Sequence, residues 1–182
     1  NTEIKKVNQN IVLVTMSGRP LDLTWEDKNI PAIVQAWHLG SKSGDAIAQV
    51  LYGDYNPSGK LTMSFPRNVG QVPIYYNYKN TGRPSTSIEQ VTNSGYADVE
   101  NSPLYSFGFG LSYTSFEYSD FKIDTNSMTK DSKINASVAV KNTGEYAGKE
   151  VVQLYLRDIV GSIARPMKEL KGFEMIELKA GE

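Results

Sequence analysis

The sequence predicts an α/β part followed by an all-β part. Two short apolar runs, at 11–16 and 31–37, have the continuous character of parallel strands that are buried on both faces. Apolar side chains then recur at helical spacing between residues 45 and 52. From residue 116 onward apolar and polar residues alternate, as in strands that face a core on one side and water on the other.

The α/β part is predicted from three elements in chain order. The strand at 11–16 is followed by Ser-Gly, and the strand at 31–37 is followed by a turn of small residues at 39–44. The helix comes next, with Ser43 or Asp45 expected near its N-cap. Strand, turn and helix in this order indicate a layer of helix on parallel sheet.

The stretch 51–66 predicts three local structures in succession. Gly53 suits the left-handed backbone at the end of a helix, so the helix is expected to stop there. Asn56 and Pro57 favour a tight turn over 54–59, because Asn bonds its own backbone in turns and Pro blocks continuation of the helix. A strand is expected to begin at Lys60.

The composition changes at Pro66. Residues 67–103 are rich in Asn, Thr, Ser, Gly and Tyr and have no sustained period, which predicts a long connection that lies over other structure. Strands are predicted at 116–123, 134–140 and 150–156. The four or five strands that the sequence offers are fewer than the roughly seven of a complete sandwich. The sandwich is therefore expected to be incomplete, with open edges that favour self-association.

Composition and charge exclude several classes of function. The 182 residues are 40% apolar and carry a net charge of −1, which argues against disorder and against electrostatic binding of nucleic acid. The absence of cysteine excludes disulfides and thiolate metal sites, and one histidine cannot form a metal site alone. No apolar run approaches the roughly 20 residues of a membrane helix. We therefore expect no cofactor, no nucleic-acid partner and no membrane partner.

Many segments resemble glycoside hydrolase family 3, the β-glucosidase and β-xylosidase family, in family order. The most distinctive is 50–61, which reads Val-Leu-Tyr-Gly-Asp-Tyr-Asn-Pro-Ser-Gly-Lys-Leu. Further segments similar to the family's α/β domain and linker lie at 17–21, 34–37, 64–67, 69–77 and 81–84. Segments similar to its fibronectin type III-like domain lie at 104–114, 140–144, 148–155 and 165–173. The resemblance covers nearly the whole chain.

The resemblance implies a domain organisation. Residues 1–66 would be the C-terminal part of an α/β sandwich domain, 67–103 a long linker, and 104–182 a truncated fibronectin type III-like β-sandwich. The expected fold class is thus α/β plus all-β, a partial α/β/α sandwich followed by an incomplete fibronectin type III-like β-sandwich.

The resemblance also implies a function. Family members hydrolyse terminal β-D-glycosides with retention, using an Asp nucleophile on an N-terminal barrel domain that this chain lacks. Retention needs two carboxyl groups about 5 Å apart. We therefore expect a C-terminal fragment of an exo-acting β-glucosidase-like enzyme, inactive alone, whose partners are the missing barrel domain and a β-linked oligosaccharide. The expected location is periplasmic or extracellular.

The turn at 39–44 is the candidate site. In one branch of the family this turn carries a Glu as acid/base, whereas this chain has Lys42 there. An ammonium does not readily protonate a glycosidic oxygen unless burial lowers its pKa strongly. Either the acid lies elsewhere in the parent enzyme, or the turn is only a wall of the substrate site. His38, Lys42 and Ser43 are the predicted substrate-binding residues, and no catalytic residue is predicted.

Other conspicuous residues have structural interpretations. Asp54 is interpreted as a turn residue, and Glu26 and Asp27 as a solvated surface on a strand or loop, where neighbouring side chains point apart. The tyrosines at 75–78 are expected to hold the connection onto neighbouring structure rather than to stack on a sugar. The alternative function is a stand-alone, non-catalytic β-sandwich protein that binds carbohydrate or another protein.

Overall fold

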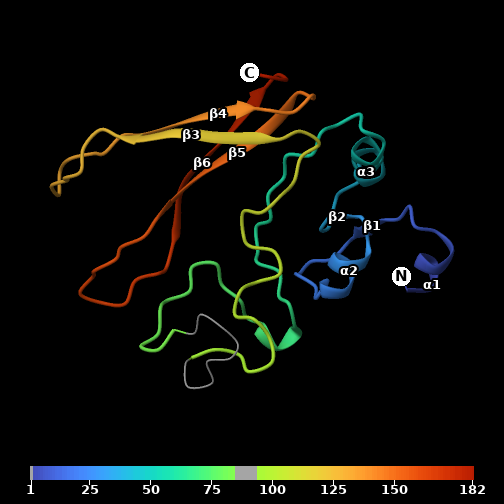
Figure 1. Ribbon diagram of the computed structural model, residues 1–182, viewed down its shortest axis with the longest axis horizontal. Coiled ribbons are helices and arrows are strands. Elements are labelled where there is room, and N and C mark those ends of the chain that lie inside the picture. Colours follow the sequence, from blue (N-terminus) through green and yellow to red (C-terminus); the bar gives the residue numbers. More distant parts are fainter. Residues whose placement is uncertain (1, 85–93) are drawn as a thin grey trace.

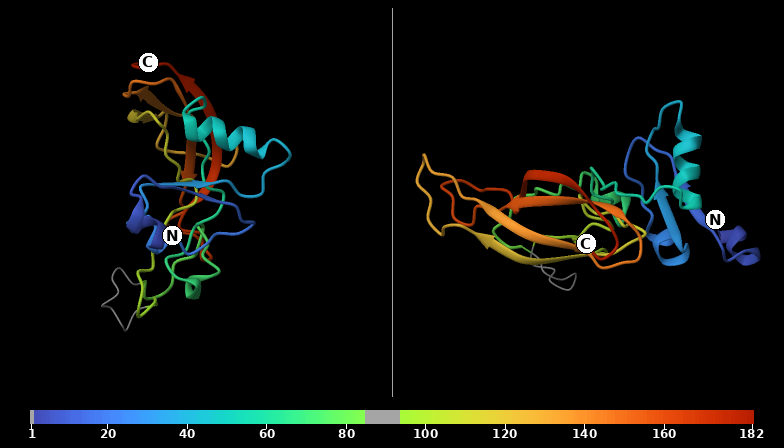
Figure 2. Two further views of the ribbon diagram at one scale, coloured as in Figure 1. Left: turned by 90° about the vertical axis from the view of Figure 1, so that its right-hand side faces the viewer. Right: turned by 90° about the horizontal axis from the view of Figure 1, so that it is seen from above.

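The computed structural model describes residues 2–84 and 94–182, so residues 85–93 of the predicted connection lie outside the described residues. The α/β elements and the four later strands occupy opposite ends of the molecule (Figures 1 and 2). The elements are α1 (Thr2–Val7), β1 (Val12–Thr15), α2 (Thr24–Asn29), β2 (Ala32–Gln35), α3 (Ser43–Tyr52), the 3₁₀ turn η1 (Val69–Gln71), β3 (Phe116–Ile123), β4 (Ala136–Asn142), β5 (Gly148–Leu156) and β6 (Glu169–Leu178).

Strands β1 and β2 form a parallel pair, as predicted. Their register runs from Val12 opposite Ala32 to Thr15 opposite Gln35. The expectation that both faces would be buried is wrong for the described residues: Thr15 is the one buried residue of β1, and Val12 is 48% exposed. Neither α1 nor α2 buries a residue, so these short helices do not cover the sheet.

Helix α3 is confirmed, and it begins at Ser43, two residues before the predicted start. Its N-cap residue is Lys42, whose side chain makes no capping hydrogen bond, and Ser43 is the first helical residue. The predicted end is confirmed, because Gly53 takes the left-handed conformation with φ of 82°.

Two further predictions for the α/β part are wrong. Glu26 and Asp27 lie on the helix α2 and not on a strand or loop. The Asp22 carboxylate, just before this helix, accepts a hydrogen bond of 3.0 Å from the Thr24 N–H. The strand expected from Lys60 does not form. Residues 60–66 instead lie antiparallel beside 104–110 through separate backbone hydrogen bonds, with a single bridge between Phe65 and Tyr105.

The connection is held by its own buried groups. Gln71 of η1 is almost fully buried, and its side chain accepts from the Arg67 N–H at 2.6 Å and donates to the Glu100 carbonyl at 2.7 Å. The Tyr76 ring stacks on Phe107 with centroids 4.1 Å apart. Tyr76 therefore holds the connection onto neighbouring structure, as the sequence predicted for this cluster.

The four later strands form two antiparallel pairs, β3 with β4 and β5 with β6. All three strands predicted here are confirmed: β3 has the predicted bounds, β4 is shifted by two residues, and β5 begins two residues earlier. The two pairs run along one another at the same end of the molecule (Figures 1 and 2). These pairs and the N-terminal elements make the chain a mixture of helices and small sheets.

A buried asparagine joins the two strand pairs. Asn142, the last residue of β4, has no exposed surface. Its side-chain nitrogen donates to the carbonyls of Tyr146 and Leu178 at 2.7 and 3.2 Å. Its side-chain oxygen accepts from the Thr114 hydroxyl at 2.6 Å and from the Gly144 N–H at 3.1 Å. One amide thereby satisfies polar groups from β6, from the turn after β4 and from the segment before β3.

Replacing Asn142 with alanine is expected to destabilise the chain strongly. The change leaves two donors and two acceptors without a partner in a buried place, so the free energy of unfolding should fall by about 3 kcal/mol. Urea denaturation measures this loss. Asn135→Ala is the control, because Asn135 is exposed and should cost under about 1 kcal/mol. Equal losses for the two variants would contradict the role of Asn142.

Candidate functional site

The carboxyl ends of β1 and β2 meet at one edge, and His38 lies there. Trp37, two residues after β2, has a positive φ of 53°, and its ring packs edge to face on Phe65 with centroids 5.8 Å apart. Such a backbone is rare for a bulky residue and needs support from its surroundings. His38 follows, exposed to solvent, with its ring against Gly18 from the loop after β1. A Cβ on Gly18 would lie 3.1 Å from that ring, so a larger residue there would make the ring shift slightly.

Lys42 and Ser43 stand at the start of α3. The Lys42 side chain is 89% exposed and forms an ion pair with Asp45 at 3.0 Å. Ser43 is half-buried, and its N–H donates to the Gly40 carbonyl at 3.0 Å, which closes the turn. The described residues thus do not bury the Lys42 ammonium, as acid catalysis by it would require. Lys42 and Ser43 are available for contact with a polar ligand.

The carboxylates that were interpreted as structural either lie away from this edge or accept hydrogen bonds from other side chains. Asp54 is exposed in the turn after Gly53, as interpreted. Asp27 is not merely solvated, because its carboxylate accepts a hydrogen bond of 2.6 Å from the Tyr105 hydroxyl. Partial burial and this hydrogen bond raise the pKa of Tyr105 above its ordinary value, so the hydroxyl stays protonated as a donor.

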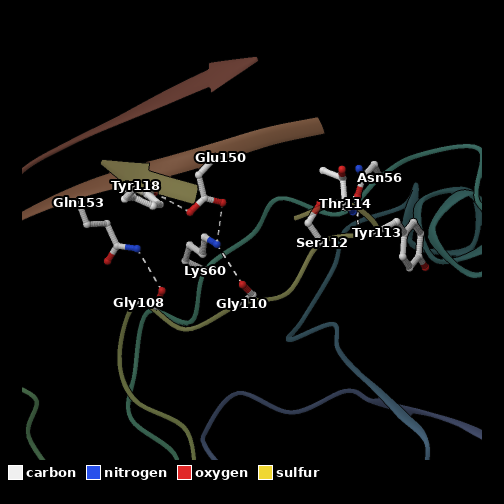
Figure 3. A network of polar contacts seen from close by, with 10 residues as sticks. All are labelled: Asn56, Lys60, Gly108, Gly110, Ser112, Tyr113, Thr114, Tyr118, Glu150 and Gln153. Atoms are coloured by element: carbon white, nitrogen blue, oxygen red, sulfur yellow. Dashed lines mark hydrogen bonds and ion pairs between the residues drawn. The ribbon is translucent and has the colours of Figure 1, made fainter. Parts of the chain in front are cut away.

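The distinctive 51–66 stretch connects the α/β part to the β part (Figure 3). The Asn56 side chain accepts from the Ser112 hydroxyl and from the Tyr113 N–H, both at 2.8 Å, and donates to the Ala147 carbonyl at 2.9 Å. The Tyr113 hydroxyl donates to the Val50 carbonyl of α3 at 2.6 Å. The turn motif therefore has an interface role in addition to its turn geometry.

A desolvated ion pair lies beside this contact. The Lys60 ammonium bonds the Glu150 carboxylate and the Gly110 carbonyl, both at 3.0 Å, and the two charged side chains are only 15% and 11% exposed. The Tyr118 hydroxyl donates to the other oxygen of Glu150 at 2.9 Å (Figure 3). Partial burial and this bond raise the pKa of Tyr118. A Cβ on Gly110 would collide with the Gly59 carbonyl, so the close approach requires glycine.

Sequence reasoning missed this network. Lys60 and Glu150 are 90 residues apart, and no period or local motif relates them. The one available signal was a charged residue, Glu150, among the apolar positions of a predicted strand. A buried position for such a residue implies a partner of opposite charge.

The hollows of the described surface lie elsewhere. One of about 400 Å³ is formed by Asn80 and the β5–β6 loop at 157–167. Another of about 330 Å³ lies over the buried ion pair, between 106–109 and β5. Neither of these two hollows is lined by His38, Lys42 or Ser43. His38 and Lys42 are exposed, and Ser43 is half-buried.

Residues 2–84 and 94–182 contain neither a membrane-spanning helix nor a cluster of metal-ligating side chains. No helix in these ranges is long and apolar enough to cross a membrane. Within the same ranges, no group of three or more His, Cys, Asp and Glu side chains is placed to hold a metal ion.

The comparisons with known proteins decide the family. Residues 2–113 match the glycosyl hydrolase family 3 C-terminal domain, and residues 150–182 match the fibronectin type III-like domain. The chain belongs to glycosyl hydrolase family 3. The resemblance recognised in the sequence is therefore confirmed, and the comparisons support an α/β-type part followed by a fibronectin type III-like part.

The relatives of this family 3 chain are much longer than the chain. A periplasmic β-glucosidase of Salmonella typhimurium is 52% identical over 182 residues, which are 100% of this chain and 24% of the relative. A β-xylosidase of Formosa agariphila is 44% identical over 98% of this chain and 24% of its own length. A solved β-glucosidase of Listeria innocua in complex with glucose superposes with a TM-score of 0.93 at 39% identity, over 100% of this chain and 25% of that one. The chain spans about a quarter of the length of these relatives.

Removing the Lys60 charge is expected to lower the free energy of unfolding more than removing an exposed charge does. Lys60→Met leaves the Glu150 carboxylate buried without a cation, so the free energy of unfolding should fall by about 3 to 5 kcal/mol. Lys42→Met breaks an exposed pair and should cost under about 1 kcal/mol. Chemical denaturation of both variants provides the comparison. Similar small losses would show that the Lys60–Glu150 pair is not desolvated in solution.

Proposed function

We propose that this chain is the C-terminal part of a retaining, exo-acting β-glucosidase that hydrolyses terminal β-D-glycosides. The observation that carries the proposal is the 52% identity, over the whole chain, to a periplasmic β-glucosidase. Retention requires a pair of carboxyl groups about 5 Å apart. His38, Lys42 and Ser43 include no carboxyl group. As the resemblance to the family implies, the nucleophile would come from an N-terminal barrel domain, and the chain alone would be inactive.

The edge formed by His38 and the 39–44 turn contributes one wall of the sugar site. Ligands of open α/β sheets bind outside the carboxyl ends of the strands, which is where His38 lies. Imidazole, ammonium and hydroxyl groups all form hydrogen bonds with sugar hydroxyls. His38 and Lys42 are exposed, so nothing within the described residues blocks hydrogen bonds between these side chains and a sugar.

The remaining parts support this wall. Residues 1–66 belong to a partial α/β/α sandwich that the rest of the enzyme completes, and residues 67–103 link it to the fibronectin type III-like part at 104–182. The bonds of Asn56 and Lys60 join the first and last of these parts. The last part therefore acts as a brace and not as a catalytic domain.

The proposed location, substrate and partners of the protein follow from what the names of its relatives say. The name of the Salmonella typhimurium relative supports a periplasmic or extracellular location. The Listeria innocua complex with glucose supports a β-linked glycoside as the substrate, and nucleic acid and membranes are not expected partners. Self-association stays a prediction from the two-stranded sheets, whose outer edges are open.

A chimera tests the proposed function. This chain replaces the matching quarter of the Salmonella typhimurium enzyme, and the release of chromophore from an aryl β-glucoside is measured. We expect kcat/KM within about 10-fold of the unmodified enzyme, because the chain supplies a wall of compatible shape, and no release by the chain alone. Hydrolysis by the chain alone would contradict the proposal. An inactive chimera, together with oligosaccharide binding by the chain alone, would support the non-catalytic alternative.

The sugar-wall residues are tested in the same chimera. His38→Ala and Lys42→Ala each remove a hydrogen-bonding group, so kcat/KM should fall about 10-fold for each. Asp45→Asn is the matched control, because it removes the ion-pair partner of Lys42 and leaves the ammonium in place. Initial rates over a range of substrate concentrations give the values. If the two alanine variants behave like Asp45→Asn, neither side chain contacts the sugar.

A further inference from the structure

Helix α3 carries the candidate site at one end and polar anchors at the other. Lys42 and Ser43 stand at its N-terminal end. No residue of α3 is buried, and Leu51 on its last turn remains 40% exposed. Helices usually take their position from the packing of an apolar face. Within the described residues the apolar residues Ile47 and Val50 of α3 are only half-buried, so the polar contacts at its C-terminal end contribute to its position.

The first anchor reaches the backbone of the helix. The Tyr113 hydroxyl donates to the Val50 carbonyl, one of the last carbonyls that a helix leaves without an internal partner. The Gly53 N–H bonds the same carbonyl at 3.3 Å, and the Tyr55 N–H bonds the Gln49 carbonyl at 3.0 Å. The chain therefore leaves the helix in a defined direction, toward Asn56.

The second anchor is the Asn56 side chain. Its oxygen accepts two hydrogen bonds, from Ser112 and Tyr113 (Figure 3). Its nitrogen donates to the Ala147 carbonyl in the turn before β5. The fit is close, because a Cβ on Gly148 would lie 2.9 Å from that nitrogen. Asn56 thereby joins the turn after α3 to two separate segments of the β part.

We propose that Asn56 is a positioning residue, which holds α3 on the fibronectin type III-like part and so sets the place of the 39–44 turn in the sugar site. This inference rests on the proposed function. A helix of 10 residues is about 15 Å long, so a tilt of about 4° at its C-terminal end moves the other end by about 1 Å. A displacement of that size is enough to change the rate of an enzyme markedly.

The test uses the active chimera. Asn56→Ala should raise KM about 10-fold and change kcat less, because a displaced wall weakens binding of the substrate and the transition state alike. Asn56→Asp keeps the oxygen that accepts from Ser112 and Tyr113 but loses the donor to Ala147. Its KM should therefore lie between those of the unmodified chimera and Asn56→Ala.

Gln153→Ala is the matched control. Gln153 of β5 donates to the Gly108 carbonyl at 3.0 Å and accepts from the Tyr155 hydroxyl at 2.6 Å, so it also bonds the segment beside 60–66 but makes no bond to α3. It should lower the melting temperature and leave KM unchanged. If Asn56→Ala also lowers only the melting temperature, Asn56 is merely structural and the proposal is overturned.

A second measurement does not depend on activity. Amide hydrogen exchange of residues 39–52 is followed in this chain as it stands. Asn56→Ala should speed exchange there about 10-fold relative to Gln153→Ala, because it releases the helix from its anchor. Equal rates would overturn the proposal. An inactive chimera with Asn56 intact would count against the proposed function instead, and the exchange rates would still decide whether Asn56 anchors α3.

Discussion

The ion pair between Lys60 and Glu150 is the interaction on which the arrangement of the two parts depends. Removing two charges from water costs several kcal/mol each unless further hydrogen bonds satisfy them. The Gly110 carbonyl and the Tyr118 hydroxyl provide these bonds, and each comes from a different segment of the β part. The pair is therefore stable only when the 54–60 turn lies against the sandwich, which couples the position of the turn to the fold of both parts.

Small residues make that close approach feasible. Gly110 lies where any Cβ would meet the Gly59 carbonyl, and Gly148 lies where a Cβ would crowd Asn56. The glycines beside the 51–66 stretch thus have a steric role at the interface, whereas Gly53 serves the backbone conformation at the end of α3. The same short stretch ends a helix, makes a turn and joins the α/β part to the β part.

In the proposed function, this chain contributes shape and contacts to the sugar site and not proton transfer. His38 and the 39–44 turn form an exposed edge, and the candidate acid position holds a solvated lysine paired with Asp45. An edge of this kind contributes to a sugar site only where it is held in place. Under our proposal, the anchors at the far end of α3 belong to the same functional unit, because the turn at 39–44 and Gly53 stand at opposite ends of that helix.

The amino-acid sequence by itself determined the local structures whose causes are local. The parallel strands, the end of α3 at Gly53 and the bounds of β3 follow from apolar runs, a glycine and an alternation that breaks only at Ser119 and Asp120. The family could also be recognised from the sequence, because its motifs occur in order. The short helix α2 was missed, since six residues without an apolar stripe give no periodic signal.

Only the tertiary structure decided what joins the parts. Lys60 pairs with Glu150 across 90 residues, the Tyr105 hydroxyl bonds Asp27, and residues 60–66 lie against 104–110 without forming a regular strand. These outcomes depend on which distant groups meet, and burial then decides whether a charge must be paired. The period of apolar residues in a sequence indicates which face of an element is apolar, but it does not indicate which distant segment packs on that face.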